Sequence, residues 1–391
     1  MMDKYIKKSF ENELKNITKK GLFRSLKTMY SADGKIISNN SKILNFSSND
    51  YLNLSNNKEV KSASIKAIEK YGCGATGSRL ISGHRAIHER VENEIAELFE
   101  SESCLIFGSG FLSGLGVVSA LADKNDEIYS DKLNHASLID GSLISRAKCY
   151  RFKHKDLNHL ERLLKNSTTK GKKIIISDSL FSMDGDIAPI EDLAKIAKKN
   201  SAMLIIDEAH AVGIYGKNGA GISSMLSKEN RPDVILGTFS KALGGYGGFA
   251  ISSKLIRDYL INRSRSFIFS TGLPPVCLGG AEKAFDIVKE KGSLGSELLG
   301  KAKLLHEYLV DLGVEMNKFE SHILPVCIGD NLKTVALSKK LLNDFNILCV
   351  AIRPPTVPEG TARLRLSVSL AHSDNDLKYT AEKIKLCMDS L

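Results

Sequence analysis

A lysine inside a glycine-rich segment is the strongest chemical signal in the sequence. Residues 237–248 read GTFSKALGGYGG and place Lys241 just after the apolar run DVILG, which is typical of a strand. Small neighbours let a bulky ligand approach the backbone, and a reachable, partly desolvated lysine amine can attack a carbonyl carbon. Thr238 and Ser240 add hydroxyl groups suited to a phosphate. Taken alone, the segment is more simply explained as a loop lysine in a flexible turn.

A carboxylate closes a second apolar run. The run MLIID ends in Asp207, and His210 follows three residues later. Because a bare buried charge is costly, a carboxylate at a buried strand end needs a cationic or donor partner. A protonated pyridine nitrogen is such a partner, and the pairing keeps the ring an effective electron sink. His210 could then reach the phenolic oxygen of the same ring. The alternative is an aspartate that only caps the following turn.

Three further apolar runs are followed by segments suited to a ligand. The run CLIF precedes GSGFLSGLG, where backbone N–H groups at Gly110 and Phe111 would open a helix and bind an anion. His135, in DKLNHASLIDG, is suited to stacking on a planar ring or to capping a helix, and Ser182 lies in DSLFSMDGDIAPI. Since the carboxyl ends of parallel strands meet at one edge of a sheet, we expect these residues to converge with Lys241.

The glycine-rich segment 108–116 also allows a dinucleotide-binding interpretation. It is a loose GxGxxxG, one residue too long for the usual fingerprint, although Asp126 and Asp131 lie at a tolerable distance. Phosphate binding is common to both interpretations. A nicotinamide-dependent oxidoreductase therefore remains a distant alternative.

The elements expected to position these residues alternate between about residues 100 and 255. Continuous Ile, Val and Leu blocks indicate strands buried on both faces, and the helical patterns between them are the rhythm of βαβ units. The sequence thus predicts an α/β domain with a mostly parallel seven-stranded sheet flanked by helices. The expected strands are Cys104–Phe107, Glu127–Ser130, Cys149–Phe152, Ile174–Asp178, Met203–Asp207, Asp233–Gly237 and Gly248–Ser252.

The pattern changes after Pro274–Pro275 and predicts a smaller α+β domain. We expect amphipathic helices near 276–290, 293–312 and 375–389, and strands near 322–328, 348–353 and 362–370. Arg363 and Arg365 share one face of the last strand, where either could pair with a substrate carboxylate; solvated arginines of an edge strand are the alternative. The predicted division is an N-terminal segment 1–55, a large domain 56–280 and a small C-terminal domain 281–391.

Composition excludes several classes of protein. The chain has 391 residues and a net charge of +10, but no apolar run approaches a membrane span and no basic run is interleaved with aromatics. The N-terminus lacks the apolar core of a secretory signal, and the seven scattered cysteines favour reduced thiols in the cytoplasm. The pair His84 and His88 lacks a third ligand, so we expect no metal site.

Together these motifs resemble the α-oxoamine synthases, a family of fold-type I enzymes that depend on pyridoxal 5'-phosphate (PLP). The resemblance covers nearly the whole chain. It is strongest for the members that condense L-alanine with a pimeloyl thioester in biotin biosynthesis, toward which RPPTVPEGTARLRLS points. The motifs that carry it are NFSSNDYLNLS, SRLISGH, DKLNHASLIDG, LFSMDGDIAPI, IIDEAHAVGIYG, GTFSKALGG, SFIFSTGLPP and RPPTVPEGTARLRLSVSLAH.

The resemblance assigns catalytic and cofactor-binding roles. Lys241 would carry PLP as an imine and later act as general base, while Asp207 would pair with the pyridine nitrogen. His210 would bond the phenolic oxygen, and His135 would stack on the ring and assist acyl transfer. Ser182 would neighbour the cofactor. The phosphate would be bound by Gly110, Phe111, Thr238 and, from the other subunit of an obligate homodimer, Ser270 and Thr271.

The resemblance also implies substrates and partners. Arg365 would bind the amino-acid carboxylate, and the other substrate contacts would be Arg24, Asn49 and Thr356. The pimeloyl group would ride on coenzyme A or on an acyl-carrier protein, for which the positive net charge is suited; neither nucleic acid nor membrane is expected as a partner. Sister reactions share the cofactor residues and stay open: 2-amino-3-ketobutyrate ligase (glycine C-acetyltransferase), 5-aminolevulinate synthase and serine palmitoyltransferase.

Overall fold

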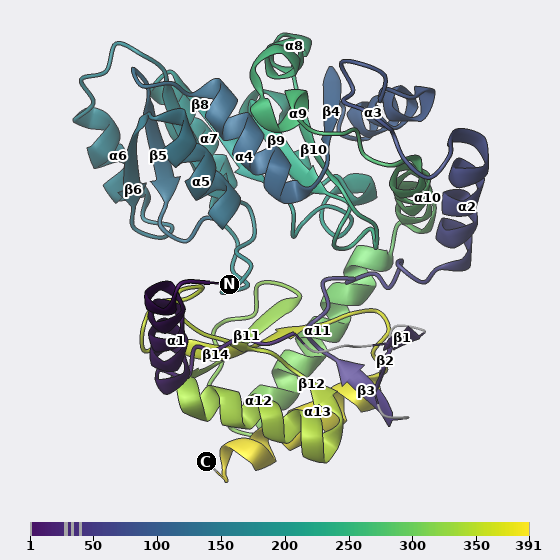
Figure 1. Cartoon of the computed structure of the whole chain (residues 1–391), viewed down its shortest axis with the longest axis vertical. Coiled ribbons are helices and arrows are strands. Elements are labelled where there is room, and N and C mark those ends of the chain that lie inside the picture. Colours follow the sequence, from purple (N-terminus) through teal and green to yellow (C-terminus); the bar gives the residue numbers. More distant parts are fainter. Residues whose placement is uncertain (1, 27–29, 33–34, 39–40, 391) are drawn as a thin grey trace. The chain divides into compact units, whose positions relative to one another are not determined.

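The computed structural model describes residues 2–26, 30–32, 35–38 and 41–390 (Figure 1). The chain forms two compact units. The large unit comprises Asn49–Ser182 and Asp186–Glu297, and the small unit comprises Met1–Ser48, Met183–Gly185 and Leu298–Leu391. The division at residues 55 and 280 stays a prediction; the compact units separate at other positions, and the N-terminal 48 residues group with the C-terminal part.

The large unit is built on the predicted seven-stranded sheet. All seven expected runs form strands, and the fold class is confirmed as α/β. Strand β10 runs antiparallel to both neighbours, β4 and β9, while the pairs among β9, β8, β7, β5 and β6 are parallel. In sheet order the strands are β4 (Ser103–Phe107), β10 (Gly248–Ser252), β9 (Val234–Thr238), β8 (Ala202–Asp207), β7 (Lys173–Asp178), β5 (Glu127–Asp131) and β6 (Lys148–Phe152).

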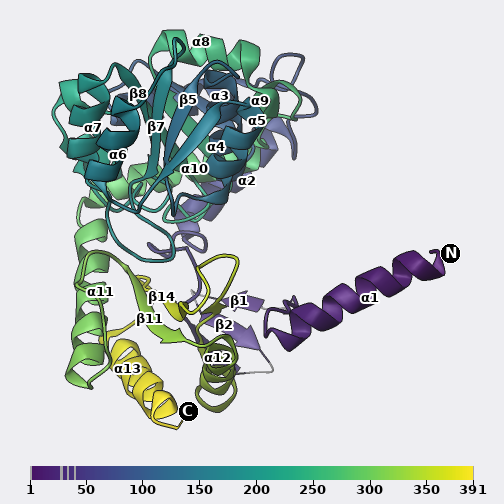
Figure 2. The ribbon, with the colours of Figure 1, turned by 90° about the vertical axis from the view of Figure 1, so that its left-hand side faces the viewer.

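Alternating side chains of the strands build a hydrophobic core on each face of the sheet. Along β7, Ile174 and Ile176 join one core and Ile175 joins the other. This burial on both faces explains why the strands are continuous apolar runs. Helices α4 (Gly110–Leu121), α5 (Ala136–Ser145), α8 (Lys254–Arg263) and α9 (Arg265–Ile268) lie on the first side, and α6 (Leu157–Lys165) and α7 (Ile190–Lys199) on the second (Figure 2).

Three further helices of the large unit pack together: α2 (Lys58–Tyr71), α3 (Ala86–Leu98) and α10 (Pro275–Lys291). A Cβ atom on Gly279 of α10 would lie 2.7 Å from both Ala63 O and Ala67 Cβ of α2. Glycine is therefore required where these two helices approach each other. Short 3₁₀ turns follow β8 at Lys217–Gly219, Ile222–Met225 and Lys228–Asn230.

The small unit is the predicted α+β arrangement. One sheet has the order β1 (Tyr30–Ala32), β2 (Lys35–Ser38), β3 (Ser41–Asn45) and β12 (Ile347–Leu348), and another the order β11 (Ile323–Gly329), β14 (Ala362–Ser367) and β13 (Ala351–Ile352). The helices are α1 (Lys4–Lys19), α12 (Asn331–Phe345), α13 (Asp374–Met388) and most of α11 (Leu294–Asp311).

Strand β14 corrects one expectation. It is the central strand of its sheet and ends at Ser367, and all six of its residues are buried. Arg363 and Arg365 are only 6% and 7% exposed. The alternative of solvated edge-strand arginines is therefore wrong.

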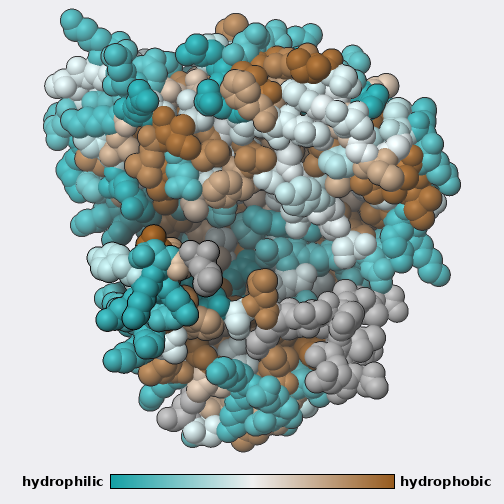
Figure 3. All heavy atoms as spheres, in the orientation of Figure 1, coloured by the Kyte–Doolittle hydropathy of each residue, from teal (hydrophilic) through white to brown (hydrophobic). Residues whose placement is uncertain are grey.

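The surface and the cysteines add few constraints. On the face shown in Figure 3, hydrophobic side chains of the large unit lie in separate patches among hydrophilic ones. None of the helices in the described ranges combines the length and apolarity that a bilayer crossing requires. All seven cysteines are unpaired. Within the described part of the chain, no group of three or more His, Cys, Asp or Glu side chains is arranged so that it could hold a metal ion.

Candidate active site

A cavity of about 190 Å³ in the large unit gathers most of the predicted site residues. It opens where the parallel strands end, the edge at which ligands bind in such sheets. The convergence expected from the sequence is thus present in the structure. The predicted residues that line it are Gly110, Phe111, His135, Ser182, Asp207, His210, Thr238 and Lys241; the others are Ser109, Asp178, Leu180, Ala209, Gly237 and Ser240.

Asp207 ends β8 and contributes a carboxylate to the cavity wall. It is 8% exposed, and its Oδ1 accepts a hydrogen bond of 2.9 Å from the backbone N–H of Ala209. The next residue, Glu208, is fully buried outside the cavity lining, where it accepts hydrogen bonds from Ser179 Oγ at 2.9 Å and from the backbone N–H of Ser223 at 2.6 Å. Two consecutive carboxylates therefore serve different purposes: one faces the cavity and the other anchors the chain.

His210 is held by a residue that the sequence argument missed. The Tyr51 hydroxyl lies 2.7 Å from His210 Nδ1 and donates a 3.0 Å hydrogen bond to Asn49 Oδ1. Tyr51 is completely buried. Asn49 does not line the cavity but is linked to its wall through this tyrosine. The only sequence signal for Tyr51 is its place in NFSSNDYLNLS.

His135 caps a helix and also lines the cavity, while its stacking on a planar ring stays a prediction. It is the N-cap of α5, and its Nδ1 accepts the backbone N–H of Ser137 at 3.3 Å. Burial lowers the pKa of His135, although the nearby Asp207 carboxylate opposes this effect. A neutral ring whose Nδ1 accepts carries its proton on Nε2. His135 can therefore donate one hydrogen bond while its ring, in edge contact with Phe111 at 6.2 Å, forms part of the wall.

Asp178 is a second pocket residue that the sequence argument missed. It ends β7, and its Oδ2 accepts the backbone N–H of His135 at 3.1 Å. Its Oδ1 is buried and finds no hydrogen-bond partner among the described residues. Burial, and then the Asp207 carboxylate, raise the pKa of Asp178 well above its usual range. Burial beside Asp207 thus favours the protonated form of Asp178, and its buried Oδ1 is placed to form a hydrogen bond with a polar ligand.

An anion site is formed where α4 begins. The Ser109 hydroxyl caps the helix by accepting the N–H of Leu112 at 3.1 Å, and the first-turn N–H groups of the helix have no intrahelical acceptor. Thr238 Oγ1 lies across from this turn; it donates to Gly247 O at 2.7 Å and accepts the N–H of Ser240 at 3.1 Å. Lys241 follows one turn after β9 and is half-buried.

The remaining predicted residues lie outside this cavity. Ser270 and Thr271 belong to the large unit, where Thr271 pairs with Ser78 in an isolated bridge. In the small unit, Arg24 donates to Pro354 O at 3.3 Å, close in sequence to the exposed Thr356.

The two arginines of β14 have different partners. Arg365 donates to Ser367 Oγ at 2.6 Å. Arg363 forms an ion pair of 2.6 Å with Asp184 and also donates to Met183 O. Arg363 is therefore already matched to a carboxylate.

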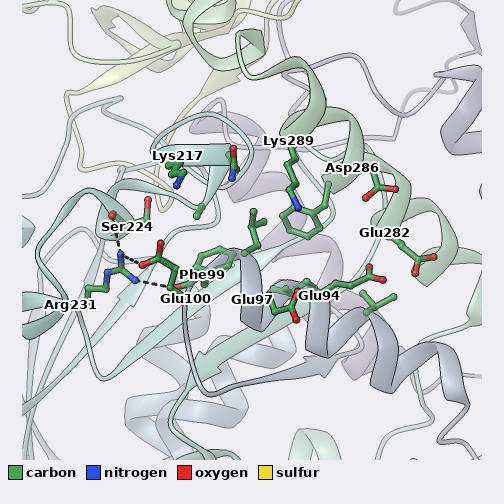
Figure 4. Close-up of a pocket in the computed structure, with 16 residues that line it drawn as sticks. Glu94, Glu97, Phe99, Glu100, Lys217, Ser224, Arg231, Glu282, Asp286 and Lys289 are labelled. Atoms are coloured by element: carbon green, nitrogen blue, oxygen red, sulfur yellow. Dashed lines mark hydrogen bonds and ion pairs between the residues drawn. The ribbon is translucent and has the colours of Figure 1, made fainter.

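A larger cavity of the same unit, about 380 Å³, lies elsewhere (Figure 4). Carboxylates from α3 and α10 line it, and Arg231 closes one side by donating to Phe99 O at 3.0 Å and to Glu100 at 3.3 Å. Burial and the Glu282 charge raise the pKa of Glu94 in its wall to about 7. None of the predicted site residues lines this cavity, so the smaller one is the candidate active site.

Known proteins resemble this chain over most of its length. The family model "Aminotransferase class I and II" matches residues 41–384. A relative from Bacillus cereus (strain G9842), named "Putative 8-amino-7-oxononanoate synthase", is 40% identical over 376 residues, covering 96% of this chain and 95% of its own.

Two solved structures are similar over most of their length. A serine palmitoyltransferase variant from S. paucimobilis with a bound PLP–myriocin aldimine has a TM-score of 0.92 and 26% identity, covering 100% of this chain and 99% of that one. The 8-amino-7-oxononanoate synthase of Francisella tularensis has a TM-score of 0.76 and 30% identity, covering 89% and 98%.

The fold and the pocket therefore define a PLP-dependent enzyme of fold type I, in the aminotransferase class I and II family. Within that class, the chain belongs to the α-oxoamine synthases, which are acyl-transferring enzymes. The nicotinamide-dependent alternative finds no support. The cavity itself fits PLP: it offers a lysine amine, a carboxylate at Asp207, an anion site at α4 and the unpaired buried Oδ1 of Asp178.

Proposed function

We propose that the protein condenses L-alanine with a pimeloyl thioester, with loss of CO2, to give 8-amino-7-oxononanoate for biotin biosynthesis. The observation that carries this proposal is the 40% identity to a relative of that name over 96% of the chain. The cavity accounts for the cofactor chemistry common to the family. The choice of amino acid and acyl chain rests on the relatives.

When bound, PLP supplies a conjugated ring that delocalises the electron pair left on the amino-acid α-carbon. Around it, Asp207 would keep the ring nitrogen protonated, and the N-terminus of α4 with Thr238 would bind the phosphate. The Lys241 amine would take the α-proton, since it lies in the cavity wall. His135 donates from Nε2 toward the thioester carbonyl, where negative charge develops during acyl transfer.

Four residues are proposed to bind the substrates. Arg365, at the position that the family resemblance assigns to the carboxylate, pairs with the alanine carboxylate, whereas Arg363 forms an ion pair with Asp184. Asn49 is linked to the cavity wall through Tyr51, whose hydroxyl donates to Asn49 Oδ1 and lies against His210 Nδ1. Arg24, which donates to Pro354 O, and Thr356, two residues after that proline, are proposed to contact the acyl chain.

A homodimer with shared active sites is part of the proposal. Ser270 and Thr271 would reach the phosphate site of the partner copy. Large apolar side chains are exposed on the same stretches of the large unit, with Ile81 at 84% and Phe269 at 72% exposure. An interface with a second copy would cover them. Mixing an inactive Lys241→Ala protein with a Thr271→Ala protein should restore part of the activity if sites are shared, whereas unlinked sites would give no gain.

Serine palmitoyltransferase activity is the second candidate. The structural similarity favours it, because TM-scores reach 0.92 for such enzymes. Their identity to this chain is only 26%, which is lower than that of the oxononanoate relatives.

A matrix of substrates separates these activities. Purified enzyme is assayed with alanine, glycine and serine against pimeloyl, acetyl, succinyl and palmitoyl thioesters, with Lys241→Ala as the inactive control. Alanine with the pimeloyl thioester should give the highest kcat/KM. A clear preference for glycine, or for serine with the palmitoyl thioester, would refute the proposal. A pimeloyl carrier protein that works by charge complementarity should turn over more slowly at higher salt, whereas insensitivity to salt would exclude that role for the net charge of +10.

A further inference from the structure

A histidine outside the cavity is bonded to two carboxylates at once. His154 follows β6, with its Nδ1 3.0 Å from Asp131 Oδ1 and its Nε2 2.9 Å from Asp186 Oδ2. Ionised carboxylates only accept hydrogen bonds, and a neutral imidazole has a single N–H. Both contacts are made together only by an imidazolium. The ring is fixed from the side by the edge contact with Phe181, at 4.4 Å between centroids.

Each of the two carboxylates organises a turn that leads into the active site. Asp131 ends β5, and it also accepts the N–H of Leu133 at 2.8 Å and that of Lys155 at 2.9 Å. The turn that it caps runs directly into His135.

Asp186 closes the loop that follows β7. Its backbone O accepts the N–H of Phe181 at 3.0 Å, and its side chain also accepts from Lys155 Nζ at 3.0 Å. The loop between these two residues carries Ser182, which lines the cavity. Strands β7, β5 and β6 are adjacent in the sheet, with β6 at its edge. One imidazolium therefore joins the ends of three neighbouring strands.

We propose that His154 is a positioning residue of the cofactor pocket, whose two hydrogen bonds fix the turn before His135 and the loop that carries Ser182. The proposal rests on the cavity being the PLP site and is independent of which substrates are condensed. His154 is not among the residues that line the cavity; it acts through Asp131 and Asp186.

The charge of this cluster makes the arrangement sensitive to alkaline pH. Burial disfavours the charged ring, but the hydrogen bonds and charges of Asp131 and Asp186 outweigh burial and raise the pKa of His154 to about 9. The other charged group in contact is Lys155, beside Asp186. Because the folded pKa lies above the usual 6.5, the stabilisation is complete below about pH 6.5 and is lost as the pH rises through about 9.

Two substitutions separate the charge from the shape of the ring. His154→Gln keeps a planar donor but cannot serve both carboxylates, whereas His154→Arg keeps a permanent charge with several donors. His159→Gln is the matched control, because the His159 ring accepts the N–H of Lys153 nearby and, among the described contacts, only the backbone N–H of His159 meets a carboxylate, that of Asp156. The readouts are the Kd of PLP for cofactor-free protein, the visible circular dichroism of bound PLP, and kcat and KM between pH 7 and about 10.

The expected results differ between the variants. His154→Gln should weaken PLP binding about 10-fold or more, alter the circular dichroism band and lower kcat, as loss of an orienting partner does elsewhere. His154→Arg should restore the circular dichroism band, and it should lack the fall in PLP affinity that wild type shows as the pH rises through about 9. His159→Gln should match wild type.

Either of two results would overturn the proposal. One is a His154→Gln protein with wild-type PLP affinity and circular dichroism, even with a lower melting temperature; the other is an unchanged alkaline fall in His154→Arg. Should His154→Gln fail to fold, Asp186→Asn removes the charge partner on the Ser182 loop alone and is judged by the same readouts. Because Kd and circular dichroism need no acyl donor, these outcomes are distinct from a failure of the substrate assignment.

Discussion

Replacement of Gly248 by alanine tests the construction of the phosphate site most directly. Gly248 opens β10 and pairs with Phe107 on one side and with Thr238 on the other. A Cβ atom there would lie 2.5 Å from Ser109 O and 2.6 Å from Gly110 N, where ordinary contacts begin near 3.4 Å. The atoms in the way are backbone atoms, so they cannot rotate aside. The start of α4 must therefore move by about 0.8 Å within a close-packed interior.

The free-energy cost of that movement determines how much PLP binding is weakened. Overpacking of this kind costs about 1–3 kcal/mol. If the overpacking destabilises the PLP-bound state by this free energy, the Kd of PLP rises about 5- to 150-fold. The assay is absorbance titration of cofactor-free Gly248→Ala protein with PLP, with thermal unfolding of the same sample to follow stability.

A neighbouring glycine supplies the control. A Cβ atom on Gly245 would meet Phe239 O at 3.5 Å and Phe239 Cβ at 3.6 Å, which are ordinary contacts, and its φ is not in the left-handed region. Gly245→Ala should therefore bind PLP like wild type. Equal Kd values for wild type and Gly248→Ala, or equal weakening in both variants, would refute the steric reasoning.

Three further predictions concern charged residues. Arg79→Met should destabilise the large unit by about 3–5 kcal/mol in urea unfolding, because the buried Glu92 loses the bidentate hydrogen bonds of 2.5 and 2.9 Å that it receives from Arg79. The Arg79→Met, Glu92→Leu double variant should recover much of this lost stability. A cost below about 1 kcal/mol for the single variant would contradict the prediction. Arg365→Ala should raise the KM for alanine about 10- to 150-fold in steady-state kinetics, whereas Arg363→Ala should mainly lower the melting temperature. A larger rise in KM for Arg363→Ala than for Arg365→Ala would mean that Arg363 binds the substrate. The pKa of Glu94 is raised to about 7 from the usual 4.5, so its ionisation in the folded protein lowers stability as the pH rises through this range. Glu94→Gln removes this ionisation and should raise stability by less than about 1 kcal/mol at pH 8, while leaving it unchanged at pH 4. Thermal unfolding at both pH values checks this.

The strands and the ligand-binding edge of the sheet could be predicted because both depend on short, local sequence patterns. A strand buried on both faces must be a continuous apolar run, and polar residues at or just after its end lie at the ligand-binding edge. Asp207, His135 and Lys241 follow from that rule. The rule gives no distances, which depend on strand order: β10 pairs with β9, which precedes it in the sequence, but also with β4, the first strand of this sheet along the chain.

The residues that the sequence did not reveal depend on long-range packing. Tyr51 contacts His210 from 159 residues away, and Asp178 gains its raised pKa only from burial next to Asp207. The alternation in β14 suggested one exposed face, but β11 and β13 flank the strand and both of its arginines are buried. Ion pairing, as between Arg363 and Asp184, makes such burial possible, and no local pattern encodes it.

The consecutive pair Asp207 and Glu208 limits how β8 can change. Successive residues of a strand point to opposite sides, so a slip of one position would send the longer carboxylate into the cavity and pull the shorter one away from it. Four hydrogen bonds to Glu208, from Ser179, Ile222 and two groups of Ser223, would be lost in the same step. Residues in the body of β8 can be exchanged for others of similar size, but the number of residues in this strand is fixed.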